Sequence, residues 1–231
     1  METTFNIIPI PVSNKTEDKV KIPEPLPRSH VLFSAPTSSG KSTLILNMIL
    51  RDKFKYNRYF KDIYYVSPTI KYDDNFEILE DYKPKRGRAN VHLVEAQEDI
   101  NSQLKSLLED IQADEKKKRL IILDDCIHLL NNSKVLQQLL TSGRHNGITS
   151  WITTQSFRKI NKTVRNNCID IIIFKSTESD LKGVIQDISE DKFQVLHEKY
   201  KEATAEPYQF LHIRTRAPAE KRYTASFKRY I

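Results

Sequence analysis

A short polar segment between two apolar runs carries the residue types that bind phosphate. Residues 35–43 read APTSSGKST. They follow the short apolar run His30–Ser34, and apolar residues at helical spacing continue from Leu44 to Ile49. At the start of a helix, unpaired backbone N–H groups and the helix dipole favour an anion. This succession of strand, loop and helix therefore predicts a P-loop, the phosphate-binding loop of nucleotide-binding proteins.

Three residues of this loop have specific expected roles. Gly40 permits the tight backbone, Lys41 places a cation on the β- and γ-phosphates, and Ser42 offers a hydroxyl to Mg²⁺. The common pattern opens with glycine, whereas this chain has Ala35. A GKS tripeptide that starts a helix by chance is the alternative, and the flanking strand and helix argue against it. The other residues expected to line the nucleotide are Ala35, Pro36, Thr37, Ser38, Ser39 and Thr43.

Two adjacent carboxylates follow the most apolar strand of the chain. Leu120–Leu123 has no polar residue at alternate positions, which predicts burial on both faces in a parallel sheet. Asp124 and Asp125 then lie at the carboxyl edge of the sheet, where α/β folds bind ligands. One carboxylate would hold the Mg²⁺ shell and the other would orient and activate water, as in a Walker B segment. Helix-capping aspartates are the alternative, and the upstream P-loop favours the catalytic interpretation.

A glutamine follows the next predicted strand. Ile148–Thr153 runs into TTQS, so that Gln155 stands beyond the strand, where a polar side chain could sense the γ-phosphate. A basic loop comes next, and after it the apolar run Cys168–Phe174 predicts another buried strand.

The remaining pattern predicts an α/β fold with a central, mostly parallel sheet flanked by helices. Further strands are expected at Asp62–Ser67 and Val91–Glu95, and two C-terminal β segments at Tyr208–Arg214 and Tyr223–Tyr230. Helices are expected at 98–114, 134–142, 178–188 and 190–203. Residues 1–27 contain five prolines, which predicts an extended N-terminal arm before an ATPase domain at 28–231.

Bulk composition points to a polyanionic partner. The 231-residue chain has a net charge of +7 and a pI near 9.2, so nucleic acid is the first candidate. No apolar run approaches the roughly 20 residues of a membrane span, and no secretion signal is evident. Cys126 and Cys168 are expected to be buried apolar thiols, without the neighbours of a zinc site. We therefore expect a soluble protein in a reducing, intracellular compartment.

The order of these motifs resembles the FtsK/HerA superfamily of DNA-pumping ATPases. Within it, the chain is most similar to the genome-packaging ATPases of double-stranded DNA viruses, the poxvirus-like and virophage-like lineage. The resemblance covers residues 28–231, and Gly143–Lys175 is its most specific part. There an arginine is followed by a Gly-Ile strand, a glutamine and an Arg-Asn pair before the last core strand.

The resemblance implies a RecA-like sheet in which the strand bearing Gln155 lies between the P-loop strand and the strand that ends at Asp124. Lys41, Ser42 and Asp124 would then bind MgATP. Asp125 looks like the catalytic base, although the superfamily more often has glutamate there. Gln155 would lie beside the γ-phosphate.

The resemblance also implies a homo-oligomeric ring, a hexamer or a pentamer, acting on double-stranded DNA with a capsid or portal component. Arg144 matches the position of an arginine finger that reaches the neighbouring subunit's nucleotide, and Arg165 is a second candidate. The expected location is the host cytoplasm or virus assembly site, or the virion. The candidates for DNA contact, of which the first three are expected to face the ring pore, are Arg158, Lys159, Lys162 and Arg165.

Three other functions share parts of the pattern. A nucleotide kinase has a P-loop, but it needs an acceptor site and usually an arginine-rich lid; the acidic pair with a separate glutamine strand favours hydrolysis. A helicase would share both the ring and the chemistry. A non-enzymatic DNA-binding scaffold with a degenerate P-loop is compatible with Ala35.

Overall fold

The computed structural model describes residues 25–51, 53–72, 77–80, 82, 84–112, 117–130, 132–188 and 193–231. In this part of the chain, nine strands form one sheet in the order β3-β2-β4-β5-β1-β6-β7-β8-β9. Neighbours from β3 to β6 pair in parallel, and those from β6 to β9 pair antiparallel. The strands are β1 (Val31–Ser34), β2 (Asp62–Ser67), β3 (Asn90–Glu95), β4 (Arg119–Leu123), β5 (Ile148–Thr154), β6 (Asp170–Phe174), β7 (Phe210–Arg214), β8 (Tyr223–Ala225) and β9 (Arg229–Tyr230).

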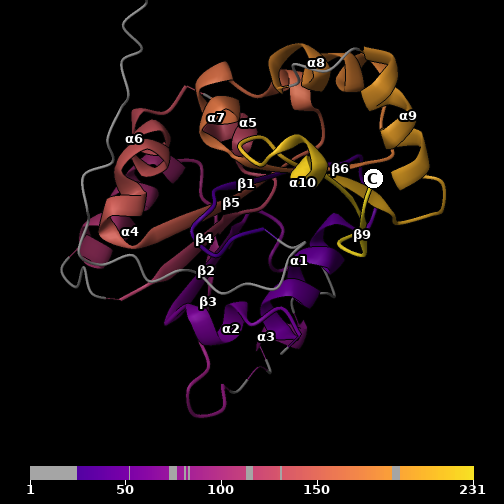
Figure 1. Cartoon of the computed structure of the whole chain (residues 1–231). Helices are drawn as coiled ribbons and strands as arrows, with labels where there is room; N and C mark the ends of the chain where they lie inside the picture. Colours follow the sequence, from indigo (N-terminus) through magenta and orange to yellow (C-terminus); the bar gives the residue numbers. More distant parts are fainter. Residues whose placement is uncertain are drawn as a thin grey trace, which may run out of the picture.

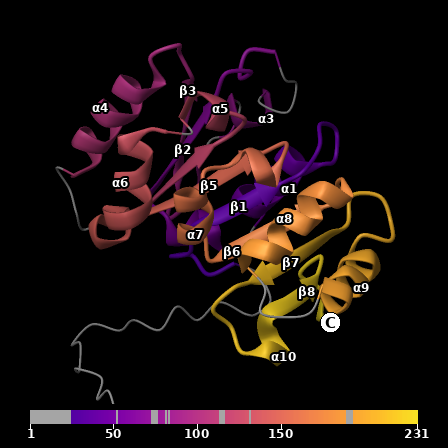
Figure 2. The ribbon, with the colours of Figure 1, turned by 90° about the horizontal axis from the view of Figure 1, so that it is seen from above.

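Helices cover both faces of the sheet, which gives three layers (Figures 1 and 2). One core cluster packs under α1 (Lys41–Leu50), α2 (Tyr56–Tyr59) and α3 (Glu77–Glu80). The other packs under α4 (Ile100–Gln112), α5 (Ile127–Leu130), α6 (Lys134–Ser142), α7 (Lys162–Asn167), α8 (Glu178–Ile188) and α9 (Phe193–Ala203). The 3₁₀ turns Gly143–Asn146 and Phe157–Lys159 flank β5, and α10 (Ala219–Arg222) precedes β8.

Strand β5 lies inside the sheet and is buried along its whole length. It pairs with β1 on one side and with β4 on the other. The prediction that the glutamine-bearing strand lies between the P-loop strand and the acidic strand is therefore confirmed. Trp151 of β5 packs on one face against Tyr56, with ring centroids 5.0 Å apart, and against Phe33 at 5.8 Å.

The mostly parallel sheet flanked by helices and the C-terminal β segments are confirmed, with local differences. Tyr208 lies in a turn before β7, and the last predicted segment is divided into β8 and β9 by a turn in which Ser226 and Phe227 have positive φ. Arg119, which directly precedes the apolar run Leu120–Leu123, is only 4% exposed and begins β4. Its guanidinium lies 3.9 Å from Asp62, so a nearby carboxylate offsets the burial of its charge.

The described chain begins with a short segment that packs on the domain. Pro25 and Pro27 are buried. Tyr56 donates a hydrogen bond to the Pro25 carbonyl at 2.6 Å, and Thr149 donates one to the Pro27 carbonyl at 2.9 Å. The rest of the predicted N-terminal arm, residues 1–24, lies outside the described residues.

Candidate nucleotide site

The P-loop joins β1 to α1, and its backbone takes the tight course that the sequence predicted. Ser38 and Gly40 have positive φ values of 60° and 88°, and the helix begins directly at Lys41. Ala35 is fully buried and its N–H donates to the Thr154 carbonyl at 3.0 Å. The φ angle of Ala35 is not in the positive range. Alanine therefore fits where the common pattern has glycine, because this position needs neither an unusual φ nor an open surface.

Asp124 is held by three hydroxyl groups at the carboxyl end of β4. Tyr65 donates to its Oδ2 at 2.7 Å, Thr153 donates to its Oδ1 at 2.7 Å, and Ser42 Oγ lies 3.3 Å from Oδ2. The side chain is 4% exposed, and this burial raises its pKa, an effect that the bonds from Thr153 and Tyr65 oppose. The structure thus joins Ser42 to Asp124, as the sequence predicted for a magnesium site.

The chemistry of these donors suits Mg²⁺. Ser42 and Asp124 supply hard oxygen atoms side by side, and Mg²⁺ in nucleotide sites is held by one or two carboxylates while phosphates and water fill the other positions. Among the described residues, no three His, Cys, Asp or Glu side chains gather as a larger ligand set. A metal held here would therefore share its coordination with the nucleotide.

Asp125 is the more exposed carboxylate and pairs with the P-loop lysine. Lys41 Nζ lies 3.0 Å from its Oδ1, and the side chain of Asp125 is 36% exposed whereas that of Lys41 is 7% exposed. Asp125 has a positive φ of 51°, and its N–H donates to Thr153 Oγ1 at 2.8 Å. The hydroxyl of Thr153 therefore organises both carboxylates at once, and it holds Asp125 in a conformation that non-glycine residues rarely adopt.

Gln155 is exposed and lies between the P-loop and the acidic pair. It lines a cavity of about 640 Å³ that also touches Asp125 and His128. It also lines a second cavity of about 570 Å³, which touches Pro36 and Thr37 of the P-loop. This position suits the predicted role of sensing the γ-phosphate.

Asp180 of α8 ties the loop after β5 to the loop after β6. Its Oδ1 accepts from Ser156 Oγ at 2.7 Å and from the Arg158 N–H at 3.3 Å, and its Oδ2 accepts from Ser176 Oγ at 3.2 Å. Asp180 is 7% exposed. The glutamine loop and the basic turn that follows it are therefore anchored to one buried carboxylate.

Three functional residues were missing from the sequence prediction: Tyr65, Thr153 and Asp180. The signal for Thr153 was present, because a polar residue in a strand buried along its length needs a hydrogen-bond partner. Tyr65 and Asp180 had no comparable local signal, since their partners lie 59 and 24 residues away.

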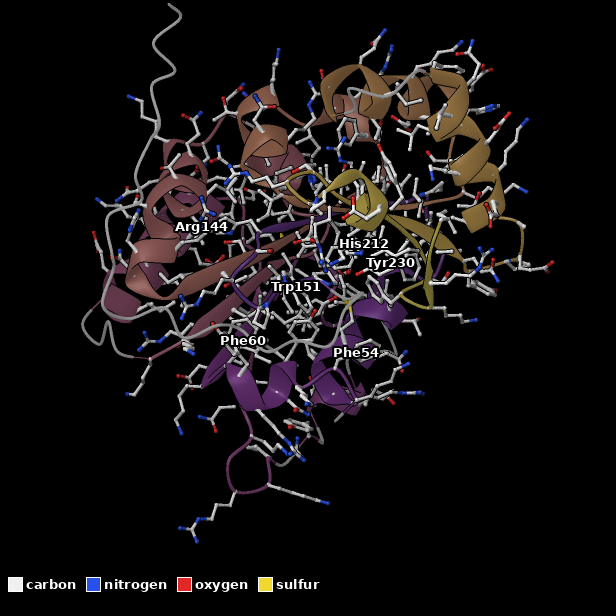
Figure 3. All side chains as sticks on the ribbon, in the orientation of Figure 1. Phe54, Phe60, Arg144, Trp151, His212 and Tyr230 are labelled. Atoms are coloured by element: carbon white, nitrogen blue, oxygen red, sulfur yellow. The ribbon has the colours of Figure 1, made fainter. Side chains whose placement is uncertain are left out.

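Arg144 lies at the other edge of the sheet. It is exposed in the 3₁₀ turn before the amino end of β5, whereas the P-loop follows the carboxyl end of β1. The seven residues of β5 separate the two edges by roughly 20 Å at about 3.3 Å per residue. Figure 3 shows Arg144 and Tyr230 on opposite sides of Trp151. Arg144 therefore cannot reach the nucleotide site of its own chain.

Other cations accompany Arg144. A cavity of about 240 Å³ is lined by Arg28, Lys118, Arg144 and His145, with Tyr59 beside them. Lys118 Nζ lies 4.1 Å from the centroid of the Tyr59 ring, and Arg28 donates to the Tyr59 hydroxyl at 3.0 Å. The amino edge thus presents a basic pocket in which an aromatic side chain positions two of the cations.

The predicted DNA-contact residues lie on and after the 3₁₀ turn that follows Gln155. Arg158, Lys159 and Lys162 are exposed, and the stem of Arg158 lies against Gly183 of α8.

Arg165 differs from these three cations. Its guanidinium forms a 2.9 Å ion pair with Asp187 and lies over the ring of Phe157, with its central carbon 5.1 Å from the centroid. Arg165 therefore already has an acidic partner in its own chain, which disfavours it as an arginine finger.

Both cysteines are buried, and their thiols stay protonated. Burial raises the pKa of Cys168 to about 12 and that of Cys126 further still. In the part of the chain that the structure describes, no helix has both the length and the apolar character needed to cross a bilayer.

The fold and the site together define a RecA-like P-loop ATPase. The chain belongs to the family described as Poxvirus A32 protein, which matches residues 30–199. The expected likeness to the poxvirus-like lineage is thereby confirmed. A sequence search of curated proteins found no match.

Solved structures of low sequence identity share the fold. B204, the DNA-packaging ATPase from Sulfolobus Turreted Icosahedral Virus, is 18% identical with a TM-score of 0.64, over 82% of this chain and 93% of that one. The genome packaging NTPase B204 from Sulfolobus turreted icosahedral virus 2, solved with ATP-gammaS, is 16% identical with a TM-score of 0.63, over 82% and 93%. EssC (ATPases 2 and 3) from Geobacillus thermodenitrificans is 15% identical with a TM-score of 0.52, over 71% of this chain and 35% of that chain.

Proposed function

We propose that this chain is one subunit of an ATP-driven motor that moves double-stranded viral DNA into a preformed capsid. One observation carries the proposal that ATP is hydrolysed at the interfaces of a homo-oligomeric ring. The P-loop and the acidic pair lie at one edge of the sheet, and Arg144 lies at the other. A ring that sets the amino edge of one subunit against the P-loop of the next would complete the site.

The family match and the net charge of +7 support the packaging role. B204, which shares the fold, is described as a genome packaging NTPase. We infer that the ring acts in the host cytoplasm or at the virus assembly site, against a capsid or portal component.

Within one subunit, the chemistry rests on positioning and charge. The loop amides and Lys41 bind the phosphates, while Ser42 and Asp124 would hold Mg²⁺, which neutralises phosphate charge when bound. In the structure Lys41 pairs with Asp125. When a phosphate becomes the partner of Lys41, Asp125 is released from this ion pair and can accept a hydrogen bond from the attacking water. Gln155 lies where it can detect the γ-phosphate.

The arginine from the neighbouring subunit supplies the remaining positive charge. An arginine finger raises the rate of phosphoryl transfer by a factor of about 10³ to 10⁵, so an isolated subunit should be nearly inactive. His30 has a pKa lowered to about 4 by burial and by the Arg144 charge, and it stays neutral at physiological pH.

A mixing experiment tests the shared site. Lys41→Ala and Arg144→Ala subunits should each be inactive alone, and a mixture should regain ATPase activity, because interfaces that pair an intact Lys41 with an intact Arg144 form again. Arg86→Ala, which removes an exposed cation from another loop, should retain wild-type activity. If the mixture stays as inactive as its components while both variants assemble with wild-type subunits, the shared site is refuted.

We propose that Arg158, Lys159 and Lys162 face the ring pore and push on the DNA backbone. Their position directly after Gln155, on a turn anchored through Asp180, supports a link between nucleotide state and DNA contact. Contacts to phosphate are tolerant of sequence and sensitive to salt. Charge reversal of all three should abolish the stimulation of ATPase activity by DNA and leave the basal rate. Unchanged stimulation would reject the pore assignment.

Movement along intact duplex separates a DNA pump from a helicase. A pump should displace a third strand bound to a blunt duplex without separating the two duplex strands. Separation of the duplex strands would instead support a helicase.

A further inference from the structure

An exposed tyrosine lies against the P-loop from the side opposite the acidic pair. Tyr208 stands in the turn between α9 and β7, and its side chain is next to Gly40. A methyl group in place of the Gly40 hydrogen would come within 3.1 Å of ring atom Cδ1 and 3.7 Å of Cβ of Tyr208. The tyrosine is nevertheless 73% exposed. One part of the ring therefore contacts the phosphate loop, and most of the ring faces solvent.

The strand order shows which end of a bound nucleotide would meet this ring. Asp124 directly follows β4, two strands from β1 on one side, and the turn of Tyr208 precedes β7, two strands from β1 on the other. Each separation is about 10 Å at the usual strand spacing. Since the acidic pair and Gln155 mark the γ-phosphate end, the nucleoside end of the molecule lies toward β7.

The turn that carries Tyr208 is fixed at the end that follows α9. In the last turn of α9, the Thr204 hydroxyl donates to the Tyr200 carbonyl at 2.8 Å, and the Tyr200 hydroxyl accepts from the Ser176 N–H at 2.6 Å. Tyr208 itself has a positive φ of 62°. A large side chain in this strained conformation persists only where the surrounding structure determines it, and such positions cluster at ligand sites. The backbone of the turn thus places the side chain of Tyr208 beside Gly40 before any ligand arrives.

We propose that Tyr208 is the platform on which the base of a bound nucleoside triphosphate stacks. This proposal rests on the nucleotide site described above and extends it to the base. An aromatic face binds every base because each has a π-face, so stacking alone selects a nucleoside triphosphate over inorganic polyphosphate without selecting adenine over guanine. Tyr208 is therefore a residue that determines specificity for nucleosides, beside a loop that binds phosphate.

Equilibrium binding to the full-length chain tests the platform without hydrolysis or DNA. Calorimetric titrations would compare AMPPCP, GMPPCP and inorganic tripolyphosphate, each with Mg²⁺. Tyr208→Ala should weaken both nucleotides by about 5- to 100-fold and leave tripolyphosphate unchanged. Tyr208→Phe should bind like the wild type because it keeps the ring. Tyr72→Ala, which removes another exposed tyrosine from the loop after β2, should have no effect.

Two outcomes would overturn the platform. In the first, the wild type binds tripolyphosphate as tightly as the nucleotides, so that no base contact exists. In the second, Tyr208→Ala weakens all three ligands by the same factor, so that the ring only supports the P-loop. Both concern binding alone, and a failure of the motor proposal, seen as an inactive mixture of Lys41 and Arg144 variants, would leave the platform intact.

Discussion

Removal of one hydroxyl group should disorganise both carboxylates of the site. Thr153 donates to Asp124 at 2.7 Å and accepts from the Asp125 N–H at 2.8 Å. Thr153→Val keeps the shape of the side chain within a strand that is buried along its length. The variant therefore isolates the hydroxyl from effects of packing volume.

Two lost bonds set the size of the effect. A hydrogen bond to a charged group contributes about 1.5–3 kcal/mol, and a buried donor left without a partner costs about 1–3 kcal/mol. Because Asp125 is partly exposed, water can replace part of its loss, whereas Asp124 is only 4% exposed. We expect Thr153→Val to lower the free energy of unfolding by about 2–4 kcal/mol and to lower the ATPase rate, since the variant removes the group that orients Asp125.

Urea unfolding and steady-state ATPase assays would measure both effects. Thr224→Val is a matched control because Thr224 is only 2% exposed and its hydroxyl lies 3.2 Å from His212 Nδ1, on a strand four places from β5 in the sheet. It should cost about 1 kcal/mol of stability and leave the ATPase rate unchanged. If the two variants lose the same stability and both keep full activity, Thr153 does not organise the carboxylates as we argue.

Two further predictions concern buried groups at the two edges of the sheet. Because burial lowers the pKa of His30 from 6.5 to about 4, the unfolded chain binds a proton in this range that the folded chain does not, and stability should fall by about 3 kcal/mol as the pH drops from 6.5 to 4. His30→Asn should remove this part of the pH dependence in urea unfolding, and parallel profiles for variant and wild type would contradict the assignment. Asp180→Asn should lower kcat on the order of tenfold with little change in KM, because the loop carrying Gln155 loses its charged anchor at Ser156. An unchanged kcat in steady-state assays would exclude a positioning role.

The central elements could be predicted because their patterns are strong and local. Leu120–Leu123 is apolar without interruption, as expected for a strand covered on both faces, and it lies in β4. The helix Lys134–Ser142 and the strand Asp62–Ser67 have the predicted bounds. The last β segment was harder to predict, because its division into β8 and β9 depends on two residues with positive φ that are not glycine.

Some residues of the candidate site are likewise identified by a local motif, whereas others are brought together only by the fold. Gly40, Lys41 and Ser42 are neighbours in sequence, and the loop motif names them directly. The pairing of Lys41 with Asp125 joins residues 84 positions apart, and the family resemblance was needed to place Gln155 between them.

The sequence alone determined that one α/β domain contains a phosphate-binding loop, a strand followed by two carboxylates and a strand followed by a glutamine. Local apolar periodicity and loop chemistry specify each of these elements. Only the tertiary structure decided that Tyr65 and Thr153 hold Asp124, that Arg144 lies at the opposite edge, and that Tyr208 lies beside Gly40. These relations depend on strand register and on packing between distant segments. A side chain's partners across the sheet are set by those two features and leave no mark on its own neighbours in sequence.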